Sequence, residues 1–273
     1  MENFNISDSL FHKFSDLLYK KAGLKLPDHK KYLLEYRLAK YIGEQTGYYD
    51  FQQFYDALIS DKDILTIFLQ EMTTNYTYFF REFIHFKFVK YYLYKYGINE
   101  PYINIWSAGC ASGEEPYSIA ITVNDCNDLN IKNKTKILAT DISPKVLKKA
   151  ISGIFSKRSI EENAEIDIKK YFSNYFIFDK TCDSYKVSQD LKDLISFRIF
   201  NLVENFPFKK QFDIVFLRNV LIYFENDVKE QILKKMYEII KPSGFLIISL
   251  SESLVGIKHN FIQKKYSIYK KIS

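Results

Sequence analysis

Residues 102–116, YINIWSAGCASGEEP, have the types and spacing of a segment that binds a nucleotide-like ligand. The β-branched and aromatic run Tyr102–Trp106 has the length of a buried parallel strand, and small residues follow it at once. Gly109 and Gly113 permit positive φ and a close approach of the backbone to a ligand, because glycine has no Cβ. We therefore predict a strand, a glycine turn and a helix, the arrangement that holds a nucleotide-like cofactor at the end of a first strand.

The acids in this segment indicate which ligand it suits. Glu114 and Glu115 stand with Pro116 in the first turn of the predicted helix, where a phosphate would otherwise bind the positive end of the helix dipole. Neither G-x-G-x-x-G nor G-x-x-x-x-G-K-[ST] occurs here. The pattern favours a ligand with an ammonium or sulfonium centre and hydroxyls. Taken alone, the segment also fits a glycine turn that only joins a strand to a helix.

An acid also follows the second predicted strand. Asp141 comes directly after Ile137–Thr140, and in doubly wound sheets an acid at this point lies beside the cofactor's ribose, where a carboxylate accepts from two hydroxyls. Asp141 is also a suitable N-cap for the helix expected over 142–150, with Pro144 in its first turn. The sequence is compatible with both roles.

Polar residues follow the later predicted strands in the same way. Strands are predicted over 195–200 and 212–217; Asn201 follows the first, and Arg218 and Asn219 follow the second. Ligands of open α/β sheets bind at the carboxyl ends of the strands, so we expect one crevice there. A purely structural interpretation leaves Arg218 and Asn219 unexplained. The candidate residues are Gly109, Glu115, Asp141, Asn201, Arg218 and Asn219.

The composition is that of a globular protein. The chain has 273 residues, of which 47% are hydrophobic and 26% charged, enough for one large or two modest domains. The net charge of +6 fits a nucleic acid, an anionic surface or an acidic protein as partner. Three cysteines without C-x-x-C and four histidines without metal-ligand spacing predict a reducing cytoplasm and no metal. No apolar run reaches the ~18 residues that cross a bilayer, so we expect no membrane-embedded segment.

Residues 1–72 show only helical patterns. The expected helices cover 7–22, 27–42, 51–60 and 64–72. In the second helix, Lys30, Arg37 and Lys40 fall within an arc of about 80° at ~100° per residue, so one face is basic. That face suits an acidic partner, although a solvated helix face gives the same pattern.

Residues 73–100 connect this helical part to the first strand. A cluster of small hydrogen-bonding side chains precedes an apolar helix, and composition alone explains the cluster as an N-cap. It consists of Thr73, Thr74, Asn75 and Thr77. Arg81 follows in a largely apolar stretch, where a guanidinium needs a partner.

The rest of the chain completes an α/β domain with one interruption. The remaining expected elements are strands over 245–250 and 261–270, a helix over 226–240, and a polar loop over 127–136. Between 156 and 196 the alternation of strands and helices stops, and two short aromatic or β-branched runs appear over 171–178 and 185–187. We interpret them as an inserted hairpin.

Four strings resemble the successive motifs of the chemotaxis receptor methyltransferases: TTNYTYFFRE, IWSAGCASGEEPYSIA, ATDIS and FDIVFLRNVLIYF. Members of that family methylate glutamate side chains of chemoreceptors with S-adenosylmethionine, which becomes S-adenosylhomocysteine. The resemblance covers nearly the whole chain. It implies an α/β fold with a Rossmann-like methyltransferase sheet, an all-α N-terminal receptor-recognition domain over 1–72, and a methyltransferase domain over 73–273. Within the latter, 73–100 would be a linker segment and helix, and about 171–196 a small antiparallel β-subdomain.

The resemblance also implies roles for individual residues. The cofactor would be bound by Asn75, Thr77 and Arg81 from the linker segment, by Gly109, Glu115 and Asp141 after the first two strands, and by Asn201, Leu202, Arg218 and Asn219 around the rest of the pocket. Leu202 would pack on the adenine edge, and Tyr223 matches a family tyrosine near the transferred methyl group. The basic helix with Lys30, Arg37 and Lys40 would meet the acidic, helical surface of a membrane-bound receptor array. We expect a cytoplasmic monomer that does not bind nucleic acid.

The implied reaction sets few demands on the protein. A glutamate carboxylate is already a nucleophile at neutral pH, so no general base is needed. The site must align the carboxylate with the methyl carbon and exclude water. Since sulfonium and carboxylate charges cancel as the bond forms, an aromatic lining suits the transition state better than a strongly polar one. Our hypothesis is that Arg81 orients the carboxylate and Tyr223 donates a hydrogen bond near the methyl group.

Two features depart from the family pattern. Some members grip a receptor tail with a glycine-rich loop in the small sheet, but the hairpin FIFDKTCDSYKV has no glycine, so we expect no such tether. The basic helix is also sparser than a strongly arginine-rich one, which predicts a modest affinity for the receptor.

Two rival functions were considered. An amino-directed nucleic-acid methyltransferase would carry [DNS]-P-P-[YFW] after the fourth strand, where this chain has LRNV. A sensing adaptor would bind S-adenosylmethionine without transferring its methyl group, and the presence of Arg81 and Tyr223 argues against it.

Overall fold

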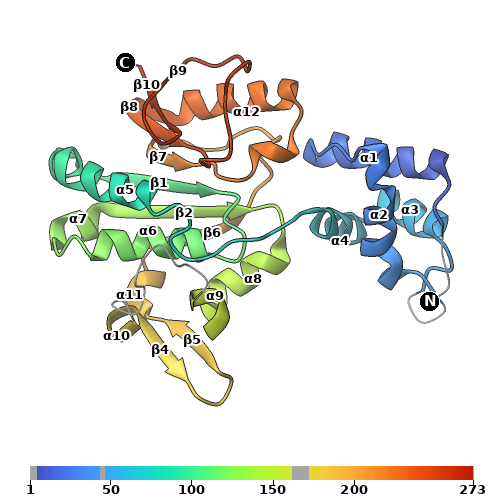
Figure 1. The fold of residues 1–273 in the computed structure, drawn as a ribbon, viewed down its shortest axis with the longest axis horizontal. Helices are drawn as coiled ribbons and strands as arrows, with labels where there is room; N and C mark the ends of the chain where they lie inside the picture. The colour runs from blue at the N-terminus through green and yellow to red at the C-terminus, as the bar shows by residue number, and fades with distance from the viewer. Residues whose placement is uncertain (1–4, 44–46, 162–171, 273) are drawn as a thin grey trace. The chain divides into compact units, whose positions relative to one another are not determined.

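The computed structural model describes residues 5–43, 47–161 and 172–272 and divides the chain into two compact units (Figure 1). The first unit comprises Met1–Thr74 together with Tyr223–Lys229, and the second comprises Asn75–Ile222 together with Glu230–Ser273.

The first unit is built from helices. They are α1 (Asp8–Ala22), α2 (Lys31–Leu38), α3 (Phe51–Ser60) and α4 (Lys62–Met72), with 3-10 turns at Asp28–Lys30 and Ala39–Tyr41. The Ser7 hydroxyl caps α1 by accepting from the Leu10 N–H at 3.2 Å, and Gly23 ends it with φ 70°. The helix expected over 27–42 is thus an α-helix between two 3-10 turns. The fully buried rings of Phe14, Phe54 and Phe68 form the core of this unit.

A seven-stranded sheet forms the centre of the second unit, with the strand order β6-β2-β1-β7-β8-β10-β9. The strands are β1 (Ile103–Ala108), β2 (Thr135–Asp141), β6 (Ile195–Ile199), β7 (Phe212–Phe216), β8 (Ile240–Ile247), β9 (Phe261–Gln263) and β10 (Ile268–Lys271). The first five strands in this order are parallel, and β10 is antiparallel to both of its neighbours. The chain order reverses beside β1, and a ligand crevice forms at such a switch point. The predicted α/β fold class is confirmed.

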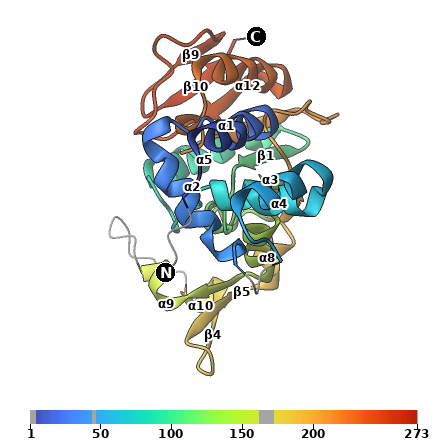
Figure 2. The same ribbon diagram turned by 90° about the vertical axis from the view of Figure 1, so that its right-hand side faces the viewer.

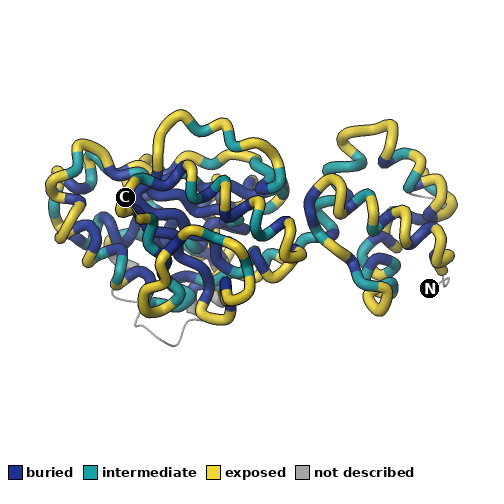
Figure 3. Tube along the Cα trace, turned by 90° about the horizontal axis from the view of Figure 1, so that it is seen from above, coloured by how far each residue is buried: buried dark blue, intermediate teal, exposed yellow. Residues whose placement is uncertain are grey.

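Helices connect and cover these strands. They are α5 (Ile84–Lys95), α6 (Glu114–Asn124), α7 (Leu129–Lys134), α8 (Pro144–Ser152), α9 (Lys157–Glu161), α10 (Phe172–Tyr175), α11 (Gln189–Lys192) and α12 (Asn226–Ile239), with 3-10 turns at Gly97–Asn99 and Leu221–Tyr223. Helix α5 packs on α6, and α6 in turn packs on β2 and β6. Figure 3 shows that the buried residues of this unit gather in its interior, whereas the outer loops are exposed.

A second, three-stranded antiparallel sheet is inserted between α8 and β6. Its order is β3-β5-β4, with β3 at Ile154–Ser156, β4 at Phe176–Asp179 and β5 at Ser184–Val187. Figures 1 and 2 both show β4 projecting away from the side of the large sheet that carries α12. The predicted small sheet is confirmed. It has a third strand, β3, which was not predicted because a run of three residues is too short to show a strand pattern in the sequence. Tyr171, the expected start of the hairpin, lies outside the described residues.

Several predicted elements are wrong in detail. The polar loop expected over 127–136 contains α7, because the Asp128 carboxylate caps the N–H groups of Asn130 and Ile131. The strand expected over 261–270 is a hairpin of two strands, since Tyr266 and Ser267 both have positive φ. The strand β6 lies at an edge of the sheet, although a core strand was expected.

Both predicted helix caps in the second unit are also wrong. Helix α8 begins at Pro144 with Ser143 as its N-cap, so Asp141 is not the cap. Helix α5 begins after Phe83 without a side-chain cap, so the Thr73–Thr77 cluster does not cap it.

Candidate functional site

The glycine turn after β1 lies against the ends of the two neighbouring strands. Gly109 and Gly113 have φ of 82° and 101°, which confirms the predicted positive φ. The N–H groups of Gly109 and Cys110 donate to the Thr140 carbonyl at 2.8 and 2.9 Å, so the turn is attached to the end of β2. A Cβ on Gly109 would lie 2.5 Å from Val220 Cγ2, in the segment that follows β7. No larger residue fits here without displacing that segment.

Asp141 connects β2 to the same turn. Its Oδ2 accepts from the Ala111 N–H and its Oδ1 from the Ser143 N–H, both at 2.9 Å. Burial raises the pKa of Asp141, and the backbone N–H groups oppose that rise. A carboxylate has about four lone-pair sites, so Asp141 can still accept from a pair of ligand hydroxyls.

Glu115, in the first turn of α6, is paired with Arg218, which follows β7. Arg218 Nη1 donates to Glu115 Oε2 at 2.9 Å, and the Ser107 hydroxyl donates to Glu115 Oε1 at 2.7 Å. The pKa of Glu115 is raised, because the effect of burial is larger than the opposing effect of the Arg218 charge. The structure therefore brings together two predicted site residues that are far apart in the sequence, and their charges satisfy each other.

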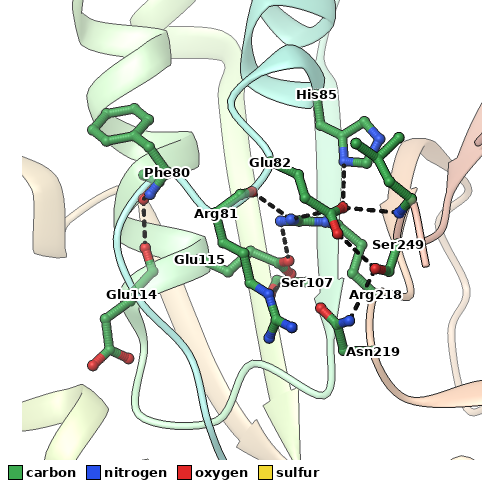
Figure 4. A network of polar contacts seen from close by, with 12 residues as sticks. Phe80, Arg81, Glu82, His85, Ser107, Glu114, Glu115, Arg218, Asn219 and Ser249 are labelled. Atoms are coloured by element: carbon green, nitrogen blue, oxygen red, sulfur yellow. Dashed lines mark hydrogen bonds and ion pairs between the residues drawn. The ribbon is translucent and has the colours of Figure 1, made fainter. Parts of the chain in front are cut away.

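Arg218 also joins this pair to the segment before α5 (Figure 4). Its Nη2 donates to the Arg81 carbonyl and to Glu82 Oε2, the latter at 3.1 Å. The Arg218 side chain is only 2% exposed. Its Nε is buried and has no hydrogen-bond partner among the described residues. Arg218 is thus held mainly by protein groups, and its Nε–H is the donor that remains for a ligand.

Glu82 is the second carboxylate bound to Arg218. Its Oε1 accepts from the Ser249 hydroxyl at 2.6 Å, and its Oε2 accepts from the Leu250 N–H at 3.1 Å, just after β8. Burial alone would raise the pKa of Glu82, but the Arg218 charge and these hydrogen bonds lower it below its ordinary value. Glu82 is therefore ionised at neutral pH.

The Arg81 side chain extends away from the Arg218 guanidinium (Figure 4). Arg81 is half-buried, its Nη1 donates to the Tyr76 carbonyl at 3.1 Å, and its guanidinium lies 5.8 and 5.6 Å from the ring centroids of Tyr76 and Tyr78. The sequence required a partner for this cation, and the structure provides the Tyr76 carbonyl together with two tyrosine rings beside the guanidinium.

Asn219 is fixed by the loop after β8. It has φ 58°, its N–H donates to Glu252 Oε2 at 2.9 Å, and its side-chain amide donates to the Ser249 hydroxyl at 2.9 Å. Glu252 is buried and also accepts from the N–H groups of Ser249 and Ile222. Burial raises the pKa of Glu252. This carboxylate therefore organises the backbone after β7.

Asn201 and Leu202 follow β6, and a lysine from α12 holds the loop that they begin. Lys235 Nζ donates to the carbonyls of Leu202, Val203 and Glu204 at 2.9, 3.0 and 2.8 Å. All three of its N–H groups are used. Leu202 is buried.

The other predicted residues lie on the segment before α5, on a 3-10 turn and in the first unit. Asn75 and Thr77 are half-buried on a stretch without helix or strand, and Tyr223 is 38% exposed at the end of a 3-10 turn. In the first unit, Arg37 donates to the carbonyl of Glu71 at 2.8 Å and Lys40 pairs with the Glu71 carboxylate at 2.8 Å. Lys30 and Lys40 are both exposed. Two of the three basic residues thus stabilise the end of α4.

Sequence reasoning missed five residues that hold the site together. They are Glu82, Ser107, Lys235, Ser249 and Glu252. The sequence held one signal for Glu82. A buried arginine such as Arg218 needs an acidic partner, and Glu82 is an acid that directly follows the predicted site residue Arg81.

Across residues 5–43, 47–161 and 172–272, no group of three or more His, Cys, Asp or Glu side chains is placed to hold a metal ion. Among the helices that the structure describes, none is long and apolar enough to span a membrane.

Comparisons with known proteins match both units. The family model "CheR methyltransferase, SAM binding domain" matches residues 75–270, and "CheR methyltransferase, all-alpha domain" matches residues 9–73. The chain is 34% identical to a chemotaxis protein methyltransferase of Borreliella burgdorferi, over 94% of this chain and 92% of the relative. It is 30% identical to one of Escherichia coli, over 98% of this chain and 92% of the relative. The chain belongs to the CheR methyltransferase family.

As a CheR methyltransferase of the chemotaxis type, the protein uses S-adenosylmethionine and releases S-adenosylhomocysteine. The site's residues fit this cofactor on three observations. The space at Gly109 excludes a side chain, Asp141 retains acceptor sites for hydroxyls, and the orphaned Arg218 Nε–H needs an acceptor such as a carboxylate.

Proposed function

We propose that this protein transfers the methyl group of S-adenosylmethionine to glutamate side-chain carboxylates of chemotaxis receptors, forming methyl esters. The proposal is supported by the sequence motifs and by the name that its relatives carry. The observation that carries it is the state of the buried acids. Glu82 and Glu115 pair with Arg218, and Asp141 accepts from backbone N–H groups. None of these three is placed as a general base, which suits a substrate that is already a carboxylate.

The segment after β7 argues against an amine substrate. It reads LRNV, without the proline pair that cradles an exocyclic amine, and its Arg218 is already bound to two carboxylates. Methylation of an amine would also require removal of a proton. We therefore expect no transfer to nucleic acid.

The residues named from the sequence would act as follows. S-adenosylmethionine, when bound, would supply the methyl group to the glutamate oxygen and would leave as S-adenosylhomocysteine, with the electron pair of the broken carbon–sulfur bond on sulfur. Arg81, whose guanidinium lies beside two tyrosine rings, orients the incoming carboxylate. Tyr223 donates a hydrogen bond near the methyl group. Asn75, Thr77, Gly109, Glu115, Asp141, Asn201, Leu202, Arg218 and Asn219 form or support the cofactor pocket.

We propose that the helical part, residues 1–72, recognises the receptor and that residues 73–273 perform the transfer. Lys30 and Lys40 are the exposed cations of the basic face and contact acidic receptor residues, whereas Arg37 and Lys40 also hold α4. We expect a cytoplasmic monomer that is recruited to receptor arrays without a receptor-tail tether.

Transfer of labelled methyl groups tests the proposal. Purified protein is incubated with methyl-labelled S-adenosylmethionine and either receptor-containing membranes or nucleic acid, and label is then released with alkali, because methyl esters hydrolyse to methanol. We expect alkali-labile label on receptors only. Arg81→Ala should reduce transfer, with the exposed Arg198→Ala as matched control. Label on nucleic acid, or alkali-stable label on receptors, would contradict the proposal.

A further inference from the structure

We propose that Glu82 is a positioning residue that fixes the direction of Arg81 by holding the turn Phe80–Glu82. This inference rests on the proposed function of Arg81. Glu82 acts through its neighbour, since its carboxylate contacts Arg218, the Ser249 hydroxyl, the Leu250 N–H and the His85 ring.

The backbone around Arg81 does not hold its conformation by itself. Phe80 and Glu82 have φ of 55° and 57°, the left-handed region that side chains with a Cβ disfavour. Two such residues flank Arg81, so the guanidinium takes its direction from a strained turn. Such strain persists only where surrounding contacts outweigh it.

The contacts that maintain the turn are found on both sides of Arg81. Before it, the Phe80 N–H donates to the Ser118 hydroxyl at 2.9 Å, and the Phe80 ring is 1% exposed. After it, Glu82 binds Arg218 at 3.1 Å and Ser249 at 2.6 Å. Phe80 is thus anchored to α6, and Glu82 to the segments after β7 and β8.

Arg218 makes the link to Arg81 direct. The Nη2 that pairs with Glu82 also donates to the Arg81 carbonyl. A neutral side chain at position 82 would weaken the hold on Nη2 and on the loop after β8 together. The Arg81 peptide would then be free to leave its present orientation, and its side chain would leave with it. Since about 1 Å of misplacement can cost on the order of 100-fold in rate, Arg81 depends on Glu82.

A double-mutant cycle tests this dependence. The variants are Glu82→Gln, Arg81→Ala and the double variant, with Glu100→Gln as matched control, because Glu100 forms a half-exposed ion pair with Lys241 at 3.0 Å. We expect Glu82→Gln to lower kcat by on the order of 10- to 100-fold in the wild-type background and by less than about 2-fold in the Arg81→Ala background. Equal factors in both backgrounds would overturn the proposal.

Amide hydrogen exchange gives a readout that needs no activity. We expect peptides covering residues 78–83 to exchange faster in Glu82→Gln than in wild-type protein or Glu100→Gln, while peptides from β1 and β2 stay unchanged. Unchanged exchange over 78–83 would overturn the proposal even if activity fell. Absence of methyl transfer by the wild-type protein would refute the proposed function instead, and the exchange result would still decide whether Glu82 holds the turn. Ser249→Ala, which removes a single bond to Glu82, should show a smaller effect in the same direction.

Discussion

Replacing Arg218 by methionine would test the charge network at the centre of the site. The substitution keeps the apolar stem but removes a guanidinium that is 2% exposed, and it leaves Glu82 and Glu115, which are 14% and 12% exposed, without their cation. Removing one partner of a buried ion pair costs about 3–5 kcal/mol. We expect Arg218→Met to lose that much free energy of unfolding at pH 7, whereas the exposed Arg198→Met should change it by less than about 0.5 kcal/mol.

Urea unfolding monitored by tryptophan fluorescence measures this loss. The single tryptophan, Trp106, is fully buried on β1, so its signal reports on the second unit even if the two units unfold separately. A loss below about 1 kcal/mol would refute the reasoning that the guanidinium compensates two buried charges.

The pH dependence gives a second check. Without Arg218, the folded-state pKa of Glu82 loses the charge that lowers it, and the pKa of Glu115, which burial already raises, rises further. The variant therefore becomes relatively more stable as these carboxyl groups take up protons. The stability deficit should therefore shrink between pH 7 and pH 5. Adding Glu82→Gln and Glu115→Gln to the variant should recover much of the loss, because no unpaired charge remains. A deficit that is the same at both pH values would show that lost packing causes it.

Three further outcomes are expected. Gly109→Ala should lose about 2–4 kcal/mol of unfolding free energy, because it adds a 2.5 Å clash with Val220 to a positive φ. The control Gly256→Ala, where φ is 77° and the space is open, should lose about 1 kcal/mol. Equal losses in the two variants would refute the clash. Lys235→Met should weaken S-adenosylhomocysteine binding in calorimetry about 10-fold, since three carbonyls of the Leu202–Glu204 loop lose their donor; unchanged affinity would show that the loop keeps its shape unaided. Burial and the Arg218 charge lower the pKa of His85 from 6.5 to about 4, so only the unfolded state takes up this proton between those values. Wild-type stability should therefore fall by up to about 3 kcal/mol as pH drops from 6.5 to 4, and His85→Gln should show a flatter urea-unfolding profile.

The sequence alone determined the elements whose ends have local causes. Helix α1 begins and ends where Ser7 and Gly23 predict, because a hydroxyl cap and a left-handed glycine act within one turn. The turn after β1 was predictable for the same reason, since only glycine takes positive φ at little cost. Runs of β-branched and aromatic residues located β1, β2 and β7 because strands buried on both faces are continuously apolar.

Local patterns failed where a distant contact decided the outcome. Asp141 has the chemistry of a helix cap, yet the glycine turn takes one of its oxygens and Ser143 caps α8. The sequence of β6 resembles that of a core strand, but β6 pairs with β2 on one side and, among the described residues, has no strand on the other, so it lies at the edge of the sheet.

The tertiary structure alone decided which charges meet. Arg218 lies 103 residues from Glu115 and 136 from Glu82 in the chain, and no periodicity relates positions so far apart. The sequence could require a partner for a buried arginine, because an uncompensated charge inside a protein is costly. Only the parallel sheet, which brings the carboxyl ends of β1 and β7 side by side, specified which partners these are.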